Sequence, residues 1–103
     1  MTIAIETTKQ DGRIFVAVRG TLNARYAPEL ESHLRTLAPS ASNTRIVLDL
    51  EHVPFLDSTG ITALINGFKI VRQHGGELAL TRVSPEIMDV FRKTLLTEFL
   101  VFE

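Results

Sequence analysis

Apolar and polar residues follow regular patterns from the start of the chain. Apolar positions alternate with polar ones from Ile3 onward, and residues 13–19 hold a second short apolar run. Asp11-Gly12 between the two segments is typical of a tight turn. The pattern predicts a β-hairpin that ends at Gly20.

Three later segments have the spacing of amphipathic helices. The apolar residues of 27–37 recur at i, i+3, i+7 and i+10, which predicts a helix with one buried stripe. The apolar positions of 61–71 also follow helical spacing, until His74-Gly75-Gly76 ends that helix. Ser84 as N-cap and Pro85 in the first turn predict the start of a third helix.

The remaining apolar segments predict strands. Residues 46–50 form an almost unbroken apolar run, the pattern of a central strand covered on both faces. Residues 77–81 and 99–102 predict two further short strands. The resulting order β-β-α-β-α-β-α-β predicts an α/β fold with a mixed, mostly parallel sheet and an antiparallel first strand. We expect residues 1–103 to form one domain, and the strand order within the sheet does not follow from these patterns.

Composition narrows the possible functions. The 103 residues are 45% hydrophobic and include no cysteine, which excludes disulfides, thiolate zinc sites and a cysteine nucleophile. Eleven Lys plus Arg stand against 12 Asp plus Glu at a net charge of −1, so we expect no direct nucleic-acid binding. No segment reaches the ~18 apolar residues of a membrane span, so we expect no membrane insertion and a cytoplasmic location.

Enzymatic interpretations find little support. The three histidines lack metal-ligand spacing: His33 and His74 fit solvated helix positions and His52 lies in a polar loop, so we expect no metal site and no cofactor. Ser58 lacks the first glycine of G-x-S-x-G, and Asp49 has no acidic pair after the first strand with which to hold Mg²⁺. We therefore expect no catalytic residue.

The most informative polar segment is Asp57-Ser58-Thr59-Gly60, between the central strand and the second helix. Sites in α/β sheets lie where strand ends meet helix N-termini, whose free N–H groups favour negative charge. Asp57 or Ser58 as a plain N-cap is the simplest interpretation. Since a cap needs only one residue, a hydroxyl is also available for phosphorylation, which adds a charge of about −1.5 to −2 that a helix N-terminus tolerates. Because polar residues surround the N-terminus of this helix, a nucleotide-binding module is a further alternative for the function.

The segment from Ile46 to Leu64, IVLDLEHVPFLDSTGITAL, resembles the signature of STAS domains, particularly of bacterial anti-sigma factor antagonists, in which D-S-[ST]-G follows a central strand. The resemblance extends over nearly the whole chain. It includes residues 20–23 after the second strand, the glycines at 75–76, and Ser84-Pro85 at the third helix.

This resemblance implies that the anti-sigma factor, itself a serine kinase, phosphorylates Ser58, and that a PP2C-type phosphatase removes the phosphate. The unphosphorylated chain would bind the kinase and release the sigma factor; whether Thr59 is a second acceptor is left open. The partner-binding surface is expected to combine residues near the motif with outward positions of the second helix: Asn23, Arg25, Tyr26, Asp57, Ser58, Thr59, Thr62, Asn66 and Lys69.

Two departures from the family pattern bear on the partner and on the C-terminus. Thr21 and Asn23 replace the acid and the Asp that relatives commonly carry after the second strand, and Thr94-Leu95-Leu96 replaces Ser-Gly-Leu. The alternative is therefore a STAS docking subunit of another assembly, such as a lipid-transport ATPase or a stress-signalling complex, without a phosphorylation cycle. Gly67 in the second helix is expected to pack closely against a strand.

Overall fold

The computed structural model describes residues 3–103, which form a five-stranded sheet in the order β1-β2-β3-β4-β5. β1 (Ala4–Gln10) and β2 (Arg13–Arg19) pair antiparallel through the predicted turn. Asp11 and Gly12 adopt φ values of 54° and 76°, as a two-residue hairpin turn requires. The predicted hairpin is confirmed.

The other three strands run parallel to β2. They are β3 (Arg45–His52), β4 (Glu77–Thr81) and β5 (Val101–Phe102). Because each is the next neighbour in the sheet, the sheet is built outward from the hairpin in chain order. The predicted mixed, mostly parallel sheet is therefore confirmed.

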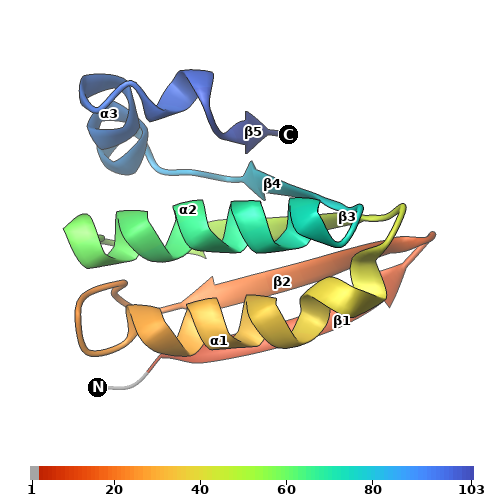
Figure 1. The fold of residues 1–103 in the computed structure, drawn as a ribbon. Helices are drawn as coiled ribbons and strands as arrows, with labels where there is room; N and C mark the ends of the chain where they lie inside the picture. Colours follow the sequence, from red (N-terminus) through yellow and green to blue (C-terminus); the bar gives the residue numbers. More distant parts are fainter. Residues whose placement is uncertain (1–2) are drawn as a thin grey trace.

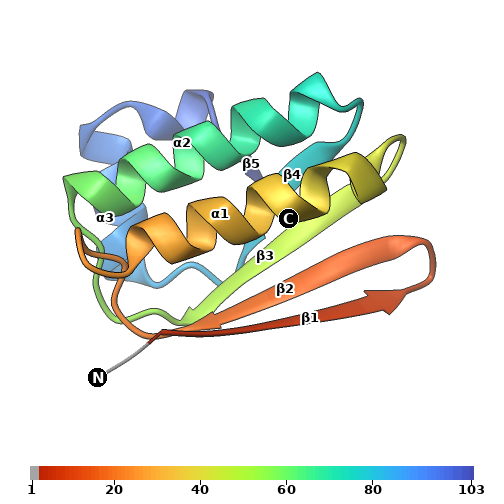
Figure 2. The same ribbon diagram turned by 60° about the horizontal axis from the view of Figure 1, so that its bottom comes forward.

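Helices connect the parallel strands. α1 (Ala27–Leu37) continues into the short 3₁₀ helix η1 (Ala38–Ala41), α2 (Ser58–Gln73) joins β3 to β4, and α3 (Pro85–Lys93) precedes the 3₁₀ helix η2 (Leu96–Glu98). α1 and α2 lie side by side over one face of the sheet (Figure 2). α3 lies on the β4 side of α2 (Figure 1), where the ring of Phe91 meets that of Phe102 at 6.1 Å between centroids. The buried stripes of these helices and the facing strand residues form one apolar core.

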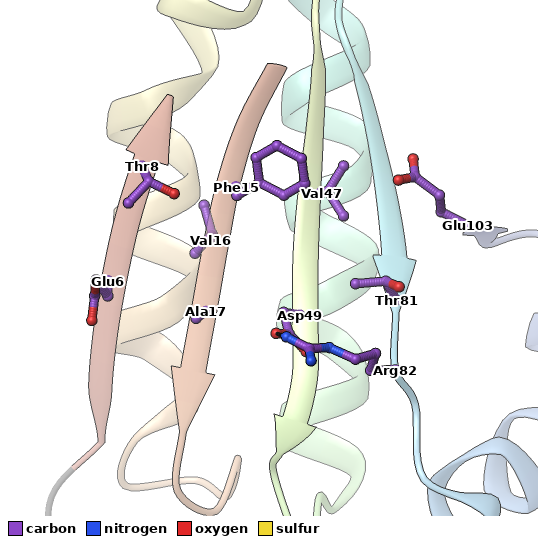
Figure 3. Close-up of a pocket in the computed structure, with 10 residues that line it drawn as sticks. All are labelled: Glu6, Thr8, Phe15, Val16, Ala17, Val47, Asp49, Thr81, Arg82 and Glu103. Carbon is purple, nitrogen blue, oxygen red and sulfur yellow. Dashed lines mark hydrogen bonds and ion pairs between the residues drawn. The ribbon is translucent and has the colours of Figure 1, made fainter. Parts of the chain in front are cut away.

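Among residues 3–103 no helix lies on the second face of the sheet, so β3 is central, as predicted, but helices cover it on one face only. Figure 3 views this face, with the helices behind the strands and Phe15, Val47 and Asp49 in front. Val47 is nevertheless buried, as predicted from its apolar run. Glu103 lines the depression around it and forms ion pairs with Arg13 and Arg45, so side chains rather than helices cover the middle of this face.

Three local predictions differ from the structure. The last strand is shorter than 99–102, because η2 continues to Glu98 and Phe99 turns its ring onto Phe68 at 5.0 Å between centroids. Gly67 faces α1 rather than a strand: a Cβ there would lie 2.5 Å from Cδ1 of Leu34. His33 is half-buried, with Nε2 hydrogen-bonded to Oγ1 of Thr7 at 2.7 Å, and is not a solvated position.

Candidate functional site

The junction between β3 and α2 is organised around the side chain of Asp57. Its Oδ1 accepts hydrogen bonds from the backbone N–H groups of Thr59 (2.9 Å) and Gly60 (3.1 Å). Asp57 is thus the N-cap of α2, and it satisfies two of the amides that a helix start leaves without partners. The simplest interpretation of the D-S-T-G segment is confirmed for Asp57.

Ser58 is the first helical residue, and its side chain is exposed. Its carbonyl accepts a hydrogen bond from Oγ1 of Thr62 at 2.9 Å. Within residues 3–103 the Ser58 hydroxyl itself forms no hydrogen bond. Because Asp57 supplies the cap, the neighbouring hydroxyl is free for another use.

The loop after β2 is bound to this junction through the backbone. Leu22 donates to the carbonyl of Phe55 at 3.0 Å, and Asp57 donates to the carbonyl of Leu22 at 3.2 Å. Gly60 is required here because a Cβ at that position would lie inside van der Waals contact of the Leu22 carbonyl oxygen. The loop and the start of α2 are therefore held in fixed relative positions.

Asn23 shapes the turn that leads into α1. Its Oδ1 accepts from the backbone N–H groups of Arg25 (3.1 Å) and Tyr26 (3.2 Å). The Tyr26 ring is half-buried against the core, and the exposed Arg25 guanidinium stands 5.5 Å from its centroid. Of these three residues, Arg25 is the one that presents its charge to solvent.

Comparison with known proteins assigns this chain to a protein family. The STAS domain family matches residues 4–103. This chain belongs to the STAS domain family. Two relatives, both named anti-sigma-B factor antagonist, are 30% identical (Bacillus subtilis) and 34% identical (Staphylococcus aureus), each over 97% of this chain and 90% and 92% of their own lengths. The Bacillus cell fate determinant SpoIIAA in its phosphorylated form has the same fold, with a TM-score of 0.71, 18% identity and coverage of 97% of this chain and 91% of that one.

The three predicted positions on α2 differ in their exposure. Thr62 and Lys69 are exposed, whereas Asn66 is half-buried. Nδ2 of Asn66 donates to Oε1 of Glu31 on α1 at 3.2 Å. The predicted outward orientation is therefore wrong for Asn66, which instead bridges the two helices.

One exposed residue of the junction is absent from the sequence-based site. Phe55 is 55% exposed, although the residues on either side of the Pro54-Phe55 pair, Val53 and Leu56, are buried. From the sequence pattern alone, residues 53–56 are predicted only as the segment that connects β3 to α2. The signal that separates them is the proline, since a strand that continued inward would not place Pro54 there.

Several charged groups of the open sheet face form ion pairs with each other. Arg82 extends over the end of β3 onto Asp49, and Nε lies 3.2 Å from Oδ1 (Figure 3). Hydrogen bonding to this carboxylate raises the pKa of Arg82 above its ordinary value. Asp49 is thereby occupied in an ion pair.

Among residues 3–103, no helix has both the length and the apolar character needed to cross a bilayer.

Proposed function

We propose that this protein is an anti-sigma factor antagonist whose binding to a serine kinase anti-sigma factor is switched by phosphorylation of Ser58. The observation that carries the proposal is the division of roles at the start of α2. Asp57 caps the helix, and the adjacent Ser58 hydroxyl is exposed and free of hydrogen bonds within residues 3–103. Modification of Ser58 therefore removes no contact on which the fold depends.

In this proposal the kinase transfers the γ-phosphoryl group of ATP to Oγ of Ser58, with loss of the hydroxyl proton and release of ADP. The kinase supplies the nucleotide and Mg²⁺, and a PP2C-type phosphatase hydrolyses the phosphoserine. The chain described here is substrate and ligand and performs no catalysis. It acts in the cytoplasm, where its kinase and the sigma factor meet.

The partner surface proposed here centres on Ser58. Arg25, Thr59, Thr62 and Lys69 supply contacts, while Asn23, Tyr26 and Asp57 fix the backbone that presents them; Asn66 contributes through its hydrogen bond to Glu31. A phosphate within this surface adds about −1.5 to −2 of charge next to the Asp57 carboxylate. A penalty of about 3 to 4 kcal/mol for desolvation and repulsion weakens binding several hundred-fold.

The comparisons support this proposal in two ways. Relatives of nearly the same length carry the name anti-sigma-B factor antagonist at 30% and 34% identity. SpoIIAA, a protein with the same fold, exists in a phosphorylated form.

Binding of Ser58 variants to the purified anti-sigma factor kinase of the same organism, with ADP present, tests the proposal. We expect Ser58→Ala to bind as tightly as the wild type and to resist phosphorylation by ATP. Ser58→Asp should weaken binding at least tenfold, since it carries part of the phosphate charge, without changing the thermal unfolding midpoint by more than a few degrees. Thr59→Ala is the matched hydroxyl control: it removes one contact of the partner surface and should weaken binding slightly, but it should keep the switch because Ser58 is unchanged.

Tight binding of Ser58→Asp would contradict the charge switch. If the wild-type protein does not bind the kinase but forms a stable complex with a transport or stress-signalling assembly, the result would favour the constitutive docking subunit instead.

A further inference from the structure

Phe55 is an aromatic residue held outward beside the proposed phosphorylation site. It is 55% exposed, whereas Val53 and Leu56 are 1% and 5% exposed. The buried residues anchor the segment on both sides, so the ring projects from a backbone that cannot turn inward without losing core contacts. Phe55 precedes Ser58 by three residues, which limits the separation of their Cα atoms to about 11 Å.

The backbone at Phe55 is also fixed by its neighbours. Its carbonyl accepts the N–H of Leu22 at 3.0 Å, and Pro54 before it restricts rotation of the chain. A side chain with two torsions on a fixed backbone loses little conformational freedom when it becomes buried in an interface. Aromatic residues with this property are common at the centres of protein interfaces.

A positive charge accompanies the ring. The hydrogen bonds that join Leu22 to Phe55 and Asp57 also hold the 20–26 loop against the junction, and Arg25 is an exposed residue of this loop. Within residues 3–103 Arg25 forms no ion pair, and its guanidinium rests over Tyr26. An apolar ring and an unpaired cation therefore lie on the same rigid junction as the Ser58 hydroxyl.

We infer that Phe55 is the anchor of the partner interface, and that the anti-sigma factor offers it an apolar socket, with a carboxylate for Arg25, next to its contact with Ser58. The inference rests on the proposed function and states where in the interface the phosphate on Ser58 interferes with binding. When the Phe55 ring is bound in this socket, a phosphate on Ser58, three residues later, lies against an apolar, desolvated surface and an acidic residue of the partner. Phosphorylation then prevents docking without altering the fold.

The test measures the dissociation constant of the complex with the purified anti-sigma factor kinase and ADP for four proteins. These are the wild type, Phe55→Ala, Phe55→Leu and Leu95→Ala. Leu95 is the matched control because it is an exposed apolar side chain, 70% accessible, at the end of α3. We expect Phe55→Ala to raise the dissociation constant about 30-fold, Phe55→Leu to raise it less, and Leu95→Ala to leave it unchanged.

The outcomes separate this inference from the proposed function. If the wild type binds and Phe55→Ala binds equally well, Phe55 is not the anchor, while the antagonist function stands. If Leu95→Ala weakens binding as much as Phe55→Ala, the effect is not specific to the junction and the inference is overturned. If the wild type does not bind the kinase, the proposed function fails and the inference fails with it. Equal thermal unfolding midpoints for wild type and Phe55→Ala exclude a folding defect.

Discussion

At the scale of single residues, two glycines of α2 make close approaches of different kinds. A Cβ on Gly60 meets the backbone carbonyl of Leu22, which cannot move without breaking its hydrogen bond to Asp57. The nearest atoms to a Cβ on Gly67 all belong to the flexible Leu34 side chain, and only its terminal Cδ1 would be too close. We expect Gly60→Ala to lower the free energy of unfolding by about 2 kcal/mol or more.

Gly67→Ala is the matched comparison. The clash with Leu34 should be largely offset by the better helix propensity of alanine, about 1 kcal/mol, so the net change should stay within about 1 kcal/mol. Urea unfolding of both variants measures the difference. Equal losses for the two variants would contradict the close backbone approach at Gly60.

Leu95 is a second residue-scale case, because it adopts the left-handed conformation with φ of 61°. It stands where the family pattern has glycine, and its side chain is 70% exposed, so little burial compensates the strain. Leu95→Gly should raise the free energy of unfolding by about 0.5 to 1 kcal/mol, as measured by thermal or urea unfolding. Leu95→Ala keeps the Cβ and should give no such gain; a gain of the same size from alanine would show that conformation is not the cause.

At the scale of elements, the short strand β5 is held by an ion pair as well as by its sheet partner. The Glu103 carboxylate bridges Arg45 and Arg13, and its backbone N–H donates to Leu80 at 2.8 Å. Hydrogen bonds from Arg45 and then Arg13 lower the pKa of Glu103 from its ordinary value of 4.5. A lowered pKa stabilises the fold above the ordinary pKa, and this contribution is lost as the pH falls through the lowered value.

We therefore expect Glu103→Gln to unfold at a lower temperature than the wild type at neutral pH, with the difference disappearing as the pH falls below the lowered pKa of Glu103. Calorimetry across this range is the measurement. The effect should be small and should shrink in high salt, because the pair is accessible to solvent. A difference that grows in acid would contradict the assigned sign.

At the scale of the whole molecule, local patterns in the sequence predict where the helices and strands lie more accurately than they predict which elements pack against each other. The hairpin follows from Asp11-Gly12, and the third helix from Ser84, whose Oγ accepts the Ile87 N–H at 3.2 Å. The family motif likewise predicts that Asp57 and Ser58 lie at the start of α2. These features depend on contacts within a few residues.

The errors come from contacts between distant segments. Periodicity shows that Gly67 and Asn66 lie on particular sides of α2, but it does not show that α1 packs there and provides Leu34 and Glu31. The apolar run of β3 predicts burial but not that side chains such as Glu103, 56 positions after Val47, cover one face. Phe55 was missed because its exposure depends on the loop at Leu22 and on the burial of its neighbours.

The role of Ser58 as a phosphorylation switch can be tested in a single experiment on the protein and its kinase. The anti-sigma factor kinase and ATP are used to phosphorylate the protein, the modified residue is mapped by mass spectrometry, and the affinities of the modified and unmodified proteins for the kinase with ADP are compared. We expect one phosphoryl group on Ser58 and binding weakened several hundred-fold. A phosphate on another residue, or equal affinity after modification of Ser58, would contradict it.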